Sequence, residues 1–225
     1  MLFSSNVRLK KCTINKSFNW VRGVMLGILM TSPLTSLAQN SDLNPDFFYF
    51  FNGKTQGNWQ IILGDEDNYM LPVTSDNAES AGKRMSLSRA DYQAAGDALN
   101  LKWSRKKGRA SFALYGANVD LSALENKAAL TFELKVLKKP KGTVSLGMDC
   151  GYPCRGEMNI QKMLRDFEVD KWVTFPIPIN CFKAKGLDLS KVNAPILLSA
   201  DQPFEIEIAN IRLELLPEGA PTCAS

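Results

Sequence analysis

Aromatic rings and nearby polar side chains are the groups in this sequence best suited to hold a ligand. Indole and phenol rings offer flat apolar faces on which the C–H-rich face of a sugar ring can pack. Sugar hydroxyls also need hydrogen-bonding partners, which arginine and aspartate side chains supply. Tyr115 lies near an expected turn, as do two further tyrosines. The candidate carbohydrate-binding residues are Trp59, Tyr69, Trp103, Arg109, Asp149, Tyr152 and Arg155.

The tryptophans have an alternative role that the sequence leaves open. Trp59, Trp103 and Trp172 all fall within segments that read as β-strands. Large aromatic side chains in strands commonly pack into the core of a domain. Core packing is therefore the alternative to a stacking platform at each of these positions.

Histidine is absent from the chain, which narrows the chemistry that remains. Ser–His and Cys–His nucleophile pairs and imidazole acid–base catalysis are excluded. Paired carboxylates could still hydrolyse a glycosidic bond. Yet the acidic residues fall mostly at turns or, like Glu205 and Glu207, on the solvated side of strands, so we expect no catalytic residue.

The acidic turn Asp65, Glu66 and Asp67 could hold a calcium ion. Carboxylate oxygens suit calcium, but the turn lacks the ligand spacing of a defined calcium loop. We therefore expect no cofactor, with a structural calcium ion as the alternative.

Four cysteines follow Cys12, at Cys150, Cys154, Cys181 and Cys223. An even number in an exported domain indicates disulfides, and four cysteines allow three connectivities. The C-x3-C segment contains glycine and proline suited to a turn, so a local bridge fits there. Such a bridge leaves Cys181 to pair with Cys223 and to hold the C-terminal tail. A metal site is the alternative, but zinc-type spacing is missing and we predict none.

Residues 1–38 read as a cleavable signal peptide. Five basic and no acidic residues precede a short apolar run from Val24 to Leu34, and Ser36-Leu37-Ala38 supplies the small residues of a cleavage site. The run has about 11 residues, whereas a membrane-spanning helix needs roughly 20. We expect export to the periplasm or the cell exterior and no membrane span after cleavage.

Removing this leader leaves a chain that is close to neutral, because all 23 acidic residues but only part of the 27 basic ones lie beyond it. There is thus no electrostatic case for nucleic-acid binding.

Alternation of apolar and polar residues predicts many short strands, because a period of two places one face inward and one in water. The expected strands are 47–51, 59–63, 70–73, 84–88, 98–103, 110–115, 130–137, 143–148, 172–179, 196–199, 204–208 and 211–215. The prolines of 172–179 suggest an edge or a bulge. One short helix is expected at 159–165, capped by Asn159, with Ile160, Met163 and Leu164 on one face.

This pattern predicts an all-β sandwich or jelly roll in a single domain. We expect a lead-in at 39–46, the β-sandwich at 47–216 and a tail at 217–225.

The order of several motifs resembles a known family. The chain from Phe48 to Leu215 resembles the C-terminal galactose-binding-like jelly-roll domain of bacterial exo-β-glucosidases of glycoside hydrolase family 3, the ExoP type. The matching segments are 50–53, 59–65, 97–103, 147–154, 172–182, 195–199 and 210–213.

This resemblance implies a galactose-binding-like β-sandwich in a setting of polysaccharide breakdown. It does not imply hydrolase activity, because the catalytic groups of those enzymes lie in large N-terminal domains. The first hypothesis is a non-catalytic module that binds β-glucan or another polysaccharide or oligosaccharide. The second is a structural domain that docks on a partner, such as a glycan-degrading enzyme. A small glycoside hydrolase using two carboxylates is the third.

Overall fold

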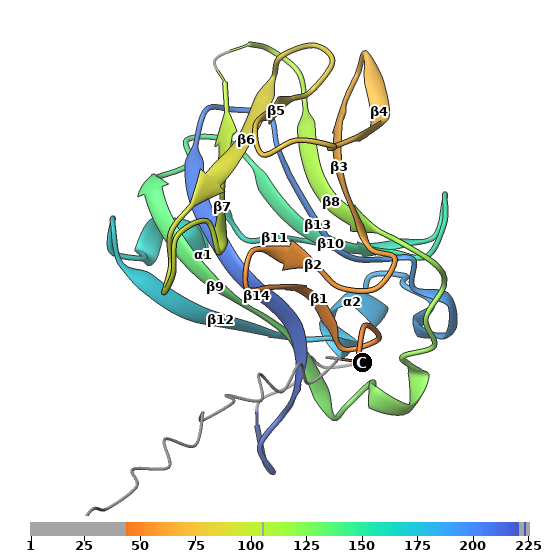
Figure 1. The fold of residues 1–225 in the computed structure, drawn as a ribbon. Coiled ribbons are helices and arrows are strands. Elements are labelled where there is room, and N and C mark those ends of the chain that lie inside the picture. Colours follow the sequence, from red (N-terminus) through yellow and green to blue (C-terminus); the bar gives the residue numbers. More distant parts are fainter. Residues whose placement is uncertain (1–43, 105, 221–222, 224–225) are drawn as a thin grey trace, which may run out of the picture. The chain divides into compact units, whose positions relative to one another are not determined.

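The protein is a sandwich of two antiparallel sheets, seen in a computed structural model that describes residues 44–104, 106–220 and 223 (Figure 1). The predicted all-β fold class is confirmed. The predicted signal peptide lies outside the described residues. Within the described part of the chain, no helix is long and apolar enough to cross a bilayer.

The first sheet has eight strands and contains the two longest ones, β9 and β14. Its main path runs in the order β12-β9-β14-β7-β6-β5, while β1 also pairs with β14 and β2 pairs with β1. Their bounds are β1 Phe48–Phe51, β2 Lys54–Thr55, β5 Ala78–Glu79, β6 Met85–Ala90, β7 Ala98–Trp103, β9 Ala128–Lys138, β12 Trp172–Pro178 and β14 Glu205–Leu215.

The second sheet has six strands in the order β11-β10-β13-β8-β3-β4. Their bounds are β3 Gln60–Asp65, β4 Asn68–Pro72, β8 Ala110–Tyr115, β10 Val144–Asp149, β11 Arg155–Asn159 and β13 Ala194–Ala200. Two short helices, α1 (Gln161–Asp166) and α2 (Asn180–Lys183), lie in the connections, with single turns of 3-10 helix at Ser122–Leu124 and Leu189–Lys191.

The core lies between the sheets and consists of the inward-facing residues of both. Phe112, Phe132 and Phe204 are among its largest fully buried side chains. Burial of large apolar side chains is the main favourable term in folding, at about 1.5–3 kcal/mol for each one. Alternation thus explains the core and the polar outer face along strands such as β6, whereas β10 and β13 are buried along their whole length.

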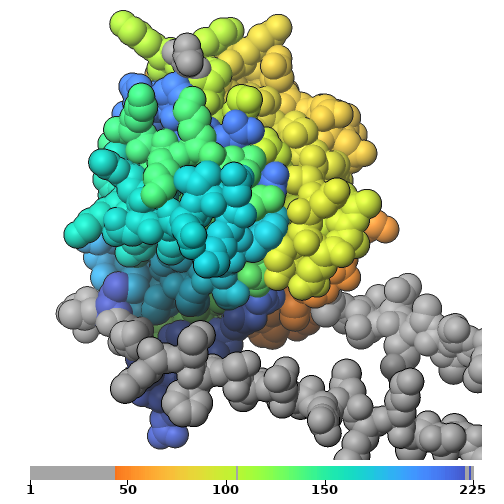
Figure 2. Space-filling model, turned by 90° about the vertical axis from the view of Figure 1, so that its left-hand side faces the viewer, coloured from red at the N-terminus to blue at the C-terminus, as the bar shows by residue number. Residues whose placement is uncertain are grey.

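One loop crosses the outer face of the eight-stranded sheet. The connection from β6 to β7 reaches β12, where Tyr92 packs edge-to-face on Trp172 with ring centroids 4.8 Å apart. Figure 2 shows this face, with the yellow segment lying beside the cyan one. Asp97 holds the loop by accepting backbone N–H bonds from residues 92–94.

Several details differ from the sequence-based expectation. The two strands expected at 204–208 and 211–215 form the single strand β14, which carries a bulge where Asn210 has a positive φ of 49°. Helix α1 begins at Gln161, whose N–H donates to Asn159 Oδ1 at 2.9 Å. Met163 does not share the buried face expected for it, because its side chain is exposed.

The edge prediction for the proline-containing strand is confirmed, since β12 ends its sheet. Strand β11 was not expected, because its residues do not alternate. Pairing with β10 holds it in place. Strand β11 is also packed closely against α2 at Gly156, where an added Cβ would lie 2.2 Å from the carbonyl oxygen of Phe182.

The predicted disulfides are confirmed. Cys150 pairs with Cys154, here called the loop disulfide, and Cys181 pairs with Cys223, the tail disulfide. The first joins positions 4 apart in sequence, and the second joins positions 42 apart. The second bridge therefore fixes Cys223 to α2.

Candidate functional site

A groove of about 760 Å³ lies on the outer face of the six-stranded sheet. Antiparallel register places Ile62, Ala113 and Leu197 side by side across β3, β8 and β13, forming an apolar row on its floor. Gly64, Ser111 and Ser199 form a parallel row of small and hydroxyl residues. The floor thus offers both a flat apolar strip and hydrogen-bonding hydroxyls.

Two exposed tyrosines flank this floor. Tyr69 lies on β4 with 71% of its surface exposed, and Tyr152 lies in the 150–154 loop with 97% exposed. The strand order places them toward opposite edges of the sheet. Met70, also exposed, adds to the wall on the Tyr69 side. The groove therefore has an accessible aromatic ring at each side.

Asp149 organises the end of the groove near Tyr152. Its carboxylate is 3% exposed and accepts hydrogen bonds from the Tyr115 hydroxyl at 2.8 Å and from Arg155 Nη2 at 2.6 Å. It also accepts the backbone N–H of Gly151 at 2.9 Å. These contacts tie the 150–154 loop to the sheet, in addition to the loop disulfide.

Arg109 and Glu157 extend this polar network across the sheet. Arg109 donates to Ser199 Oγ from Nε at 3.0 Å, and its Nη2 forms an ion pair with Glu157. Glu157 lies 4.0 Å from Arg155 Nη1. A chain of charged side chains therefore runs from Asp149 through Arg155 and Glu157 to Arg109.

Burial and charge shift two of these groups. Burial, with the hydrogen bond to Asp149, raises the pKa of Tyr115 to about 12, so its hydroxyl stays protonated and donates. Burial lowers the pKa of Arg155, but the bond to Asp149 outweighs it and the net shift is upward. Both groups therefore keep fixed donor roles near neutral pH.

The structure brings together five of the seven candidate residues and separates two. Tyr69, Arg109, Asp149, Tyr152 and Arg155 all line the groove. Sequence reasoning did not select Met70, Glu157, Ser111 or Ser199, because their placement depends on which strands pair.

Trp59 and Trp103 do not belong to the groove and lie in the core. Trp59 is 6% exposed and donates from Nε1 to the carbonyl oxygen of Pro45 at 2.8 Å. Trp103 is 3% exposed, stacks on Phe204 and donates to the carbonyl oxygen of Ala110. Core packing, the alternative noted for these two residues, is the role that the structure gives them.

The acidic turn considered for calcium surrounds an arginine. Arg84 Nη1 lies 2.9 Å from Asp67 and 3.7 Å from Asp65, and its Nη2 lies 3.5 Å from Glu66. Asp65 also accepts backbone N–H groups from Asp67, Asn68 and Gly82. All three carboxylates thus converge on one guanidinium, which offsets part of their negative charge. Across the described ranges, no group of three His, Cys, Asp or Glu residues is arranged to hold a metal ion.

Comparison with known sequences identifies the family. Residues 58–213 match the Exop_C family, described as galactose-binding domain-like. The chain belongs to this family. The resemblance noted in the sequence is thereby confirmed. No curated protein sequence matches the chain.

Solved structures share this fold at low sequence identity. The extra C-terminal domain X of the exo-1,3/1,4-β-glucanase ExoP from a Pseudoalteromonas species has 16% identity and a TM-score of 0.62, covering 80% of this chain and 99% of that one. Against the whole ExoP enzyme, the match covers only 21% of its length. The family 30 carbohydrate-binding module of a Clostridium thermocellum cellulosomal cellulase has 16% identity and a TM-score of 0.53. This match covers 75% of this chain and 96% of the module.

Proposed function

We propose that this protein is an exported, non-catalytic accessory module that binds a polysaccharide chain in the groove of its six-stranded sheet. The observation that carries the proposal is the convergence of exposed aromatic rings and a polar network on one groove. Concave sites with an apolar lining and a few fixed polar groups are typical of small-molecule and oligosaccharide binding.

Each part of the groove has a role in this proposal. Tyr69 and Tyr152 stack on the apolar faces of sugar rings at the two sides of the floor. Arg109 and Arg155 bind sugar hydroxyls. Ion pairs with Glu157 and with the buried Asp149 hold these two arginines in position before a ligand arrives. A preordered site binds more tightly, because less side-chain entropy is lost on binding.

The proposed ligand class is β-glucan. The ExoP enzyme is named as a 1,3/1,4-β-glucanase, and the cellulase module is named as carbohydrate-binding. In the proposed setting the protein acts beside a glycan-degrading enzyme, to which it supplies substrate contact. The two disulfides support an oxidising compartment outside the cytoplasm, as the leader sequence does.

Affinity electrophoresis of the purified protein through gels containing laminarin, mixed-linkage β-glucan or xylan tests the proposal. We expect retardation by at least one β-glucan. Tyr152→Ala reduces affinity about two- to tenfold, because an aromatic stacking contact contributes about 0.5–1.5 kcal/mol. Its stability stays within about 0.5 kcal/mol of the original, because the side chain is exposed.

Leu215→Ala is the matched control, since Leu215 is also a large exposed side chain (75%) and does not line the groove. It should leave retardation unchanged. Absence of retardation in every glycan, or equal retardation of Tyr152→Ala and the original protein, contradicts the proposed site. In the first case a pull-down from periplasmic extract would test the docking hypothesis instead.

A further inference from the structure

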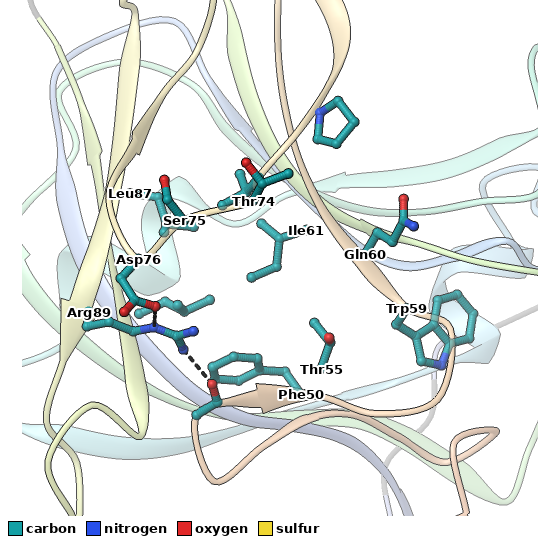
Figure 3. Close-up of a pocket in the computed structure, with 14 residues that line it drawn as sticks. Phe50, Thr55, Trp59, Gln60, Ile61, Thr74, Ser75, Asp76, Leu87 and Arg89 are labelled. Carbon is teal, nitrogen blue, oxygen red and sulfur yellow. Dashed lines mark hydrogen bonds and ion pairs between the residues drawn. The ribbon is translucent and has the colours of Figure 1, made fainter.

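A second, smaller cavity of about 340 Å³ opens at the edge of the sandwich, where the two sheets separate (Figure 3). It is bounded by β1 and β2, the start of β3, the segment 72–76 and β6. None of its lining residues lines the groove. It is therefore a separate candidate site on the same domain.

The floor of this cavity is the hydrophobic core itself. Phe50, Ile61, Leu87 and Leu99 line it, and all four are buried core residues. The core therefore closes the inner end of the cavity, and Ile61, at 9% exposed, is the most accessible of the four. Such a cavity accepts one end of a molecule, whereas the groove lies along an open sheet face.

The rim carries hydrogen-bonding side chains that have no protein partner. Thr55, Gln60 and Thr74 line the cavity, and in the described part of the chain their side chains form no hydrogen bond to another residue. Figure 3 shows them around its opening, with Ile61 between them. Thr55 is half-buried and the other two are exposed, so a ligand would replace water at these hydroxyl and amide groups without breaking a bond within the protein.

One guanidinium is fixed at the opposite side of the rim. Arg89 donates from Nε to Asp76 Oδ1 at 2.8 Å and from Nη1 to the carbonyl oxygen of Gly53. Both contacts are drawn in Figure 3. Asp76 balances the charge of Arg89, so the rim is neutral overall and still offers the remaining guanidinium N–H groups.

We propose that this cavity is a second carbohydrate site, which takes a single neutral sugar ring. A charged ligand would find no free counter-charge, and a wholly apolar one would leave the rim groups without partners. A sugar ring presents an apolar face to the floor and hydroxyls to the rim. The volume lies at the lower end of the roughly 300–1,000 Å³ found for small-molecule sites. The choice of sugar as the class rests on the proposed function.

Amide-detected NMR titration of the purified protein tests this site directly. The probes are D-glucose, D-galactose and D-mannose, with cyclohexanol as a ring that lacks most of the hydroxyls. We expect at least one sugar to shift the amides of Thr55, Gln60 and Thr74 with millimolar affinity, and cyclohexanol to shift them less.

The double variant Gln60→Ala with Thr74→Ala should weaken the sugar about tenfold or more, because two hydrogen bonds are lost. The matched control is Gln93→Ala with Thr143→Ala, two exposed positions that do not line the cavity. This control should leave the affinity unchanged.

Three results would overturn the proposal: no shift at the cavity with any sugar, an equal response to cyclohexanol, or equal weakening in the control variant. Tyr152→Ala separates the two sites, because it should weaken groove binding and leave the cavity response intact. Retardation by β-glucan without a cavity response overturns the second site alone. A cavity response without retardation overturns the groove alone.

Discussion

Replacing Asp149 by asparagine tests whether the polar network holds the groove together. The carboxylate accepts three hydrogen bonds, from Tyr115, Arg155 and Gly151. Asparagine keeps the shape of the side chain and one acceptor oxygen but loses the charge. The new NH2 group costs least at the position that accepts the Gly151 N–H, so that contact is lost, while the contacts with Tyr115 and Arg155 are weakened and no cavity is left.

The size of the effect follows from these contacts. A hydrogen bond to a charged group contributes about 1.5–3 kcal/mol, against about 0.5–1.5 kcal/mol between neutral groups. One lost bond and two weakened ones amount to about 3 kcal/mol. The Arg155 side chain is 37% exposed, so water recovers part of the lost pairing. We expect the free energy of unfolding to fall by about 2–3 kcal/mol.

Urea denaturation followed by tryptophan fluorescence measures this loss. Asp201→Asn is the control, because Asp201 lies exposed between β13 and β14, and it should change stability by less than about 0.5 kcal/mol. The double variant Asp149→Asn with Arg155→Met should recover part of the loss, since contacting residues couple by about 0.5–3 kcal/mol. Equal stability of Asp149→Asn and Asp201→Asn would show that the Asp149 network does not stabilise the fold.

Two further predictions concern stability. In the chain-entropy model, replacing both cysteines of the tail disulfide by serine lowers the free energy of unfolding by about 4 kcal/mol. The same replacement in the loop disulfide lowers it by about 2 kcal/mol, because the closed loop is shorter. Thermal melts of the two variants check this order. Burial raises the pKa of Asp97, but the backbone N–H bonds from residues 92–94 outweigh it and the net shift is downward. The contribution of the Asp97 carboxylate to the free energy of unfolding is therefore complete above the ordinary aspartate pKa. It is lost as the pH falls below about 4. The stability difference between the original protein and Asp97→Asn, measured by denaturation from about pH 6 to about pH 2, should shrink over that range; a constant difference contradicts the pKa shift.

Much of the fold could be predicted because alternation marks strands that bury one face. The segments that became β7, β8 and β9 alternate clearly and were placed almost to the residue. Strand β11 escaped prediction because its pairing with β10, and not its own pattern, makes it extended. The continuity of β14 was missed because its bulge interrupts the alternation.

The site was predictable in its residue types but not in its place. Asp149, Tyr152 and Arg155 lie close in sequence around the loop disulfide, so their meeting followed from one turn. Tyr69 and Arg109 join them only because β3 and β8 pair and β13 lies next to them. Tryptophans were poor guides, because indole rings serve core packing as well as stacking.

The two outer faces of the sandwich explain why the groove lies on the six-stranded sheet. On the eight-stranded sheet, Lys135 pairs with Glu207 on the neighbouring strand and lies 4.9 Å above the ring of Trp172, which Tyr92 contacts from its edge. Trp172 is thus already in contact with protein groups. On the other sheet, Tyr152 remains almost fully exposed beside a charged network. A sugar ring needs an open aromatic face as well as polar partners, and the groove combines the two.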